Sequence, residues 1–121
     1  LENKREKLAK SAVTMADDLN ADAMVVFTVS GRMVRETAWM RPKHSKIFAL
    51  CADERVAGEM SLYRGVEPVI IEGFCPDLPV LDAISTLKER GFLIIGNTVV
   101  VSSSTKAVEQ ISNSVQVHRV D

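Results

Sequence analysis

One short segment of the chain combines residue types that suit an anion. The segment is Thr28-Val29-Ser30-Gly31-Arg32, and it supplies two hydroxyls, an arginine for bidentate contact and a glycine at which the backbone can approach a ligand closely. If a helix begins where this segment ends, the free backbone N–H groups of its first turn are further donors. The hydroxyls, the arginine and these N–H groups together suit a phosphate. A capped strand-to-helix turn without a ligand has the same pattern, so both interpretations stay open.

A second polar segment follows a later apolar run. It is Ser102-Ser103-Ser104-Thr105, and its hydroxyls could add to an anion site, with a solvated polar loop as the alternative. The candidate phosphate-binding residues are therefore Thr28, Ser30, Gly31, Arg32, Ser102, Ser103 and Ser104.

Residues for other chemistries are not grouped in a way that supports catalysis. The most basic stretch, residues 41–46, is typical of solvated surface or a subunit contact rather than a polyanion site. His44 and His118 have no serine, cysteine or carboxylate at the spacing of a nucleophilic relay, and we expect both at the surface. The G-x-G-x-x-G and P-loop patterns are absent. No catalytic residue and no metal site is predicted.

Length, charge and apolar patterning limit the classes of protein. The 121 residues suffice for one domain, and 46% hydrophobic with 26% charged residues is an ordinary globular composition. A net charge of −1 gives no field toward nucleic acid or an anionic membrane, and the apolar runs are shorter than the roughly 20 residues that span a bilayer. Cys51 and Cys75 lack metal-site spacing, which predicts reduced thiols and a cytoplasmic protein.

Strands and helices must position the candidate residues. Unbroken apolar runs such as Ala23–Phe27 predict strands buried on both faces of a parallel sheet. The steps from Leu8 to Ala12, Met15 and Leu19 predict an amphipathic helix with these side chains toward the core. The predicted strands are residues 23–27, 47–51, 67–71, 98–102 and 114–120. Four helices are predicted, at residues 3–20, at 32–40, after Asp53 as the capping residue and before the strand at 67, and at 79–90.

The order of these elements predicts the fold class. It is a three-layer α/β/α open sheet, mainly parallel, of about five strands with a C-terminal antiparallel strand pair, which leaves room for a short helical turn near residues 107–111. Trp39 falls at a helical position that favours packing in the core or an interface. Ligands on such sheets gather beyond the carboxyl ends of the strands, where residues 28–32 would lie.

The same residues resemble a known family. Thr28 to Arg32, followed by Arg41-Pro42, is similar to the T-x-S-G and R-P signature of the carboxy-terminal domain of pyruvate kinases. The next landmarks of that family resemble L-Y-R-G-V-E-P-V at residues 62–69, K-E-R-G-F at 88–92 and the apolar strand at 98–101. These matches follow one another in order along nearly the whole chain.

The resemblance implies a regulatory and assembly role. It makes Thr28, Ser30, Gly31 and Arg32 an effector phosphate loop for a sugar phosphate or nucleotide monophosphate, and it implies a homo-oligomer, a tetramer in the parent enzyme. Phosphoenolpyruvate, ADP, magnesium and potassium bind elsewhere in such enzymes, so this chain by itself is not expected to catalyse phosphoryl transfer. Because it opens at Leu1, we expect residues 1–121 to be one domain excerpted from a longer chain.

Some residues depart from the family pattern. Val29 stands where many sugar-bisphosphate-regulated members have lysine, and residues 102–105 replace a glycine-rich loop, which implies a different effector or none. Ile94-Ile95 replaces a commonly polar pair and favours burial against another chain or domain. The alternative hypothesis is therefore a purely structural subunit-interface domain without a ligand.

Overall fold

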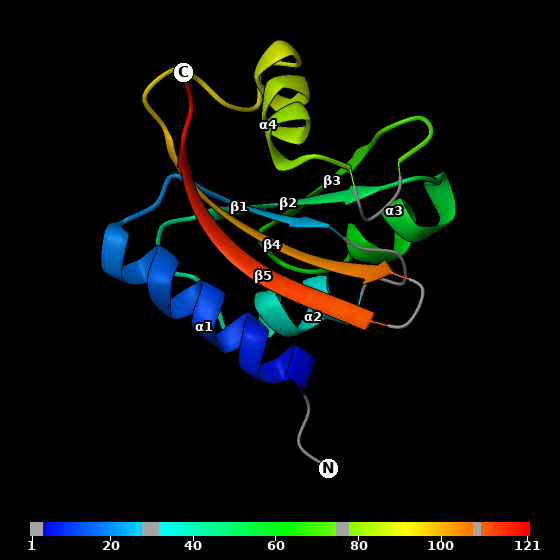
Figure 1. Cartoon of the computed structure of the whole chain (residues 1–121), viewed down its shortest axis with the longest axis horizontal. Helices are drawn as coiled ribbons and strands as arrows, with labels where there is room; N and C mark the ends of the chain where they lie inside the picture. Colours follow the sequence, from blue (N-terminus) through cyan, green and yellow to red (C-terminus); the bar gives the residue numbers. More distant parts are fainter. Residues whose placement is uncertain (1–3, 28–31, 75–77, 108–109) are drawn as a thin grey trace.

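A computed structural model describes residues 4–27, 32–74, 78–107 and 110–121 (Figure 1). Within these ranges the helices and strands alternate as the apolar pattern predicts. The elements are α1 (Lys4–Leu19), β1 (Ala23–Phe27), α2 (Arg32–Trp39), β2 (Lys46–Cys51), α3 (Glu54–Met60), β3 (Val66–Ile70), α4 (Val80–Glu89), β4 (Thr98–Ala107) and β5 (Gln110–Arg119).

The described strands form one sheet in the order β3-β2-β1-β4-β5. β1 pairs in parallel with β2 and β4, β2 pairs in parallel with β3, and only the β4–β5 pair is antiparallel. The side chains of α1, α2 and α3 pack in one core cluster, and α4 packs against the opposite face (Figure 1). The predicted three-layer, mainly parallel α/β fold is confirmed.

β1 is buried along its whole length. Its side chains alternate between the two faces of the sheet, with Met24 and Val26 in the cluster under α1 to α3 and Val25 and Phe27 in the cluster under α4. An uninterrupted apolar run is therefore required here, because a polar side chain on either face would lose water without gaining a partner.

The residues that were predicted to begin or end helices and to tolerate an edge position are found in those places. Asp53 caps α3, since its Oδ1 accepts a hydrogen bond of 2.9 Å from the Val56 amide. Gly91 has a φ of 85° immediately after Arg90, the C-cap residue of α4, and its amide donates to the Lys88 carbonyl, so glycine is needed at this helix end. Pro68 lies in β3, an edge strand, which is where a residue without an amide hydrogen is tolerated.

The predicted buried face of α1 is wrong in part. Leu19 is 49% exposed, and Leu8 and Met15 are half-buried. The side chains of α1 that are fully buried are small, and they are Ala9, Ala12, Val13 and Ala16. Small side chains let the helix axis approach the sheet closely, and the larger apolar residues then lie along the flanks of the contact.

The polar stretch after residue 101 is also different from the prediction. Ser103, Ser104 and Thr105 belong to β4 rather than to a loop, and Ala107 and Gln110 belong to strands rather than to a helical turn. Ile111 of that predicted turn also belongs to β5, and residues 108–109 lie outside the described residues. The physical reason is the continuous ladder from Thr98↔Arg119 to Ala107↔Gln110, which satisfies backbone groups that a polar loop would leave to water.

The packing of α4 gives a direct test of the core. Leu87 is fully buried, whereas Leu81 on the same helix is 67% exposed. We expect Leu87→Ala to lower the free energy of unfolding by about 2–5 kcal/mol, because it leaves a cavity under α4, the one described helix on its face of the sheet. Urea denaturation measures this, and the matched control Leu81→Ala should stay within about 0.5 kcal/mol of the parent. Equal losses for the two variants would contradict the packing described for α4.

Cys51 is a free, buried thiol at the end of β2. Its Sγ lies 3.8 Å from the Asp53 and Val69 carbonyl oxygens, and burial, followed by the charge of Asp53, raises the pKa of this thiol. The folded chain therefore holds less thiolate than the unfolded chain at any pH near the ordinary thiol pKa. Cys75 lies outside the described residues.

We expect Cys51 to be unreactive in the folded chain. In a Cys75→Ser variant, alkylation by iodoacetamide at pH 8 should be at least about 100-fold slower in buffer than in urea, because both burial and the raised pKa suppress the exposed thiolate. The rate is followed by mass spectrometry. Similar rates in buffer and in urea would mean that the thiol is accessible.

Candidate functional site

The first candidate segment connects β1 to α2 at the carboxyl edge of the sheet. Phe27 is the last residue of β1 and is buried, and Arg32 is the first residue of α2. Thr28, Ser30 and Gly31 lie outside the described residues. The amide groups at the start of α2 therefore face the same edge at which β1 ends.

The second candidate segment lies on the neighbouring strand. Ser102 of β4 is paired with Val26 of β1 in the parallel register. Ser103 and Ser104 continue β4 beyond this level, and β4 runs on to Ala107. The register thus brings the two polar segments, which are about seventy residues apart in sequence, to adjacent strands at one edge.

Ser102 and Ser103 have different surroundings. Ser102 is 1% exposed and shares the face of Val100, on the side of the sheet that α1, α2 and α3 cover, and its Oγ has no hydrogen-bond partner among the described residues. Ser103 is buried on the opposite face, where its Oγ lies 2.9 Å from the Oγ of Ser114 on β5. The strand alternation therefore separates the two hydroxyls, which the prediction of a loop did not anticipate.

A short polar row continues from Ser114 along β5. The Gln116 Nε2 donates to the Ser114 Oγ at 3.5 Å, and the His118 Nε2 lies 2.7 Å from the Gln116 Oε1. His118 is half-buried and hydrogen-bonded to its own strand, and His44 is exposed in the segment before β2. The two histidines lie on different elements and do not form one site.

The basic stretch at 41–46 is anchored to the body of the domain. The Lys43 amide donates to the Asp17 Oδ1 at 2.9 Å, and the Ser45 Oγ donates to the Ala21 carbonyl at 2.7 Å. Lys46 forms an exposed ion pair of 3.5 Å with Glu67. Such a pair contributes little to stability, so the two side-chain to backbone contacts define the course of this segment.

Two features of α2 bear on the sequence analysis. Trp39 is 69% exposed, so it does not pack in the core of this chain and the interface alternative stays a prediction, and the Arg35 guanidinium lies 5.0 Å from the centre of its ring. Glu36 is only 8% exposed, and its Oε2 has no hydrogen-bond partner in the described part of the chain. A glutamate among polar neighbours on an amphipathic helix normally indicates a solvent-facing position, so no local signal could reveal its burial.

Among the residues that the structure describes, no group of three or more His, Cys, Asp or Glu side chains could hold a metal ion. No described helix has both the length and the apolar character that crossing a bilayer requires.

Comparison with known proteins identifies relatives of the chain. Residues 6–118 match the family model for the pyruvate kinase alpha/beta domain. A pyruvate kinase from Staphylococcus epidermidis is 30% identical over 112 residues, which is 91% of this chain and 19% of the relative. The chloroplastic pyruvate kinase isozyme G of Ricinus communis is 33% identical over 120 residues, covering 95% of this chain and 28% of the relative.

Solved structures agree in fold. A Cryptosporidium parvum pyruvate kinase in complex with ADP superposes on the whole chain with a TM-score of 0.85 at 24% identity, over 24% of its own length. This chain therefore spans between about a fifth and somewhat more than a quarter of the relatives it matches. With a family model that matches nearly its entire length, the chain belongs to the pyruvate kinase alpha/beta domain family.

Proposed function

We propose that the chain is the regulatory and oligomerisation domain of a pyruvate kinase, an enzyme that transfers a phosphoryl group from phosphoenolpyruvate to ADP. The family match supports this, and the relatives are several times longer, so the catalytic groups would belong to the rest of the enzyme. We assign the magnesium and potassium expected of such an enzyme to the rest of the enzyme as part of this proposal, on the resemblance to the family alone.

The proposed effector site is a phosphate site at the carboxyl edge, formed by Thr28, Ser30, Gly31 and Arg32 with residues 102–104 beside them. The observation that carries this proposal is the parallel register Val26↔Ser102, which sets the strand with the serines next to the strand that leads into the loop. The start of α2 adds backbone N–H donors and the positive end of the helix dipole. This charge is local and compatible with a net charge of −1.

Ser102 supports the same site in a second way. A buried hydroxyl without a hydrogen bond costs about 1–3 kcal/mol, and such groups are rare in folded proteins unless a function requires them. Ser102 directly follows the buried residues Val99 to Val101, and an apolar side chain would pack at this position as well as serine does. We therefore include Ser102 among the groups that a bound phosphate, or a water that bridges to it, would satisfy.

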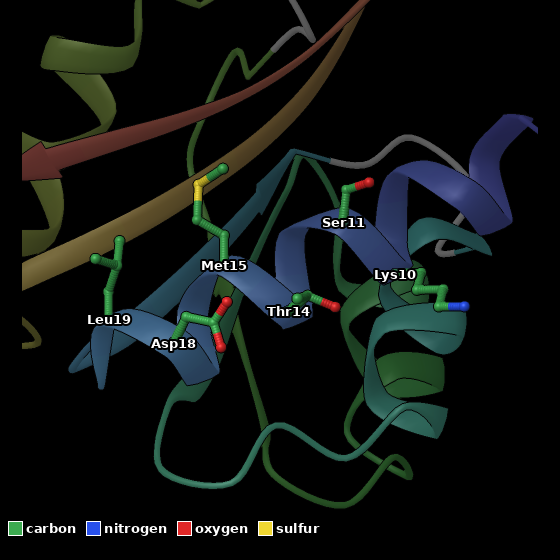
Figure 2. A pocket seen from close by; sticks show the side chains of 6 residues that line it. All are labelled: Lys10, Ser11, Thr14, Met15, Asp18 and Leu19. Carbon is green, nitrogen blue, oxygen red and sulfur yellow. The ribbon is translucent and has the colours of Figure 1, made fainter.

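The proposed oligomerisation surface lies along β5 and α1. β5 is an edge strand of ten residues with an exposed Val117, and unpaired edge strands are templates for pairing with another chain. α1 contacts both β4 and β5, and Figure 2 shows Met15 and Leu19 extending from the same side of this helix. A shallow hollow of about 660 Å³ follows its outer face, lined by Lys10, Ser11, Thr14, Met15, Asp18 and Leu19 (Figure 2).

The compartment remains a prediction. The free thiol of Cys51 agrees with a reducing environment such as the cytoplasm, and the relative from Ricinus communis is a chloroplastic isozyme.

Calorimetric titration tests the effector site. Fructose 1,6-bisphosphate, glucose 6-phosphate and AMP are titrated into the chain, and at least one should bind. Arg32→Ala should weaken that binding by at least about tenfold, because it removes a charge-assisted contact to phosphate. The matched control Arg55→Ala removes the same charge from the exposed surface of α3 and should bind as the parent does.

The outcomes separate the two hypotheses for this domain. If none of the three metabolites binds, or if Arg32→Ala binds unchanged, the effector site is refuted. Sedimentation velocity completes the test, since a ligand-dependent shift of the oligomer distribution supports regulation, and a ligand-indifferent oligomer supports the purely structural alternative.

Substitution of the two serines distinguishes a binding role from a structural one. Ser103→Ala should lower the free energy of unfolding by about 1 kcal/mol, because it removes the hydrogen bond to Ser114. Ser102→Ala should not lower it, because the Ser102 Oγ has no described partner, but it should weaken binding of the metabolite that the parent binds. Urea denaturation and calorimetry measure the two effects. A loss of stability in Ser102→Ala with unchanged binding would assign Ser102 a structural role.

A further inference from the structure

A second hollow lies at the amino edge of the sheet, away from the proposed phosphate site. Its volume is about 710 Å³, within the range of small-molecule sites, and it lies between the end of α2, the segment 41–45 and the turn that precedes β3. Trp39, Arg41, Tyr63 and Arg64 contribute to its wall. Because these residues come from two stretches that lie more than twenty residues apart in sequence, the hollow is a product of the fold rather than of one helix face.

The hollow has two guanidinium groups for an anion. Arg41 and Arg64 are exposed, and within the described residues neither has an ion pair or a hydrogen bond from its side chain. The described ion pair in this region joins Lys46 to Glu67 and involves neither arginine, so both guanidinium groups are available to bind an anion. Guanidinium groups bind phosphate and carboxylate in bidentate geometry, so the charge of the hollow suits either anion.

The hollow also has aromatic surface. Trp39 is the only tryptophan of the chain, and its ring is largely exposed, with the Arg35 guanidinium 5.0 Å from the ring centre. Tyr63 is half-buried and packs against the core beneath the hollow. A large exposed ring beside free cations is characteristic of a recognition surface, and a flat ligand could stack on it.

The backbone of Arg41 supplies an independent observation. Its φ is 53°, in the left-handed region, and its amide donates to the Ala38 carbonyl at the end of α2. Glycine or asparagine normally takes this position at a helix end, because a side chain there is unfavourable. The chain keeps an arginine where glycine would fold at least as well, which indicates that its side chain has a use.

We propose that this hollow binds a small organic anion that carries a flat ring, with its phosphate or carboxylate on Arg41 and Arg64 and its ring against Trp39 and Tyr63. The site is independent of the phosphate site proposed at the carboxyl edge, and neither requires the other. Phosphate and carboxylate ligands share this chemistry, so representatives of both are tested.

Trp39 makes the test direct, because it is the only tryptophan of the chain and its ring lines the hollow. The ring-bearing anions are AMP and 4-hydroxybenzoate, and the partial probes are adenosine, which lacks the charge, and ribose 5-phosphate, which lacks the aromatic ring. Fluorescence, excited beyond the absorption of the probes, and calorimetry should both detect at least one ring-bearing anion. Each partial probe should bind at least about tenfold more weakly than that anion.

The decisive variant is Arg41→Gly. It should weaken binding by at least about tenfold while the urea midpoint stays the same or rises, because glycine relieves the positive φ. Arg64→Gln should weaken binding similarly without a backbone change, and Arg55→Ala, an exposed arginine outside the hollow, should bind as the parent does. Unchanged affinity in Arg41→Gly would show that the Arg41 side chain takes no part in binding and would refute the proposal.

Other outcomes overturn the proposal as well. If neither ring-bearing anion changes the Trp39 fluorescence up to about 10 mM, the hollow is not such a site. If AMP binds but Arg32→Ala abolishes that binding and Arg41→Gly does not, AMP occupies the carboxyl edge instead. Failure of the hollow therefore leaves the effector site standing, and failure of the effector site leaves the hollow standing.

Discussion

The parallel pairing of β1 with two neighbours is the constraint on which the remaining structure depends. Every residue from Ala23 to Phe27 is buried, and the register joins Val26 to Ala49 on one side and to Ser102 on the other. A strand covered on both faces must leave the sheet at its carboxyl end and return as a helix on one face. This requirement orients the start of α2 toward the same edge as the serines of β4.

The two faces of the sheet that contains β1 are covered by different numbers of described helices. Three described helices share one face, and one described helix packs on the other. Along the edge strand β5, alternation of side chains puts the hydrogen-bonded Gln116 and His118 on one face and the exposed Val117 on the other. α2 spans about 12 Å from Arg32 to Trp39. Its two ends therefore face chemically different edges, with backbone donors at one and an exposed ring at the other.

Much of this fold can be predicted from the sequence, because buried parallel strands and amphipathic helices have distinct local patterns. Ala23–Phe27 is predicted with its observed bounds, and Asp53 and Gly91 mark helix ends by their chemistry. The predictions are wrong where contacts with residues distant in sequence determine the structure of a segment. Ser103 to Thr105 look like a loop until β5 pairs with them, and which side of α1 is buried depends on how closely it approaches the sheet. For the site, residue types suggest the segments 28–32 and 102–104, but only the β1–β4 register shows that the strands bearing them are neighbours.

The central claim is that the carboxyl edge, where β1 meets β4, is the phosphate-binding edge of the domain. Amide chemical shifts of the isotopically labelled chain, followed during titration with fructose 1,6-bisphosphate, glucose 6-phosphate and AMP, test it most directly. At least one of the three should shift the amide signals of residues 28–32 and 102–104 together, with one dissociation constant. Unchanged amide chemical shifts of both segments in an excess of each metabolite would contradict the phosphate-binding role of this edge.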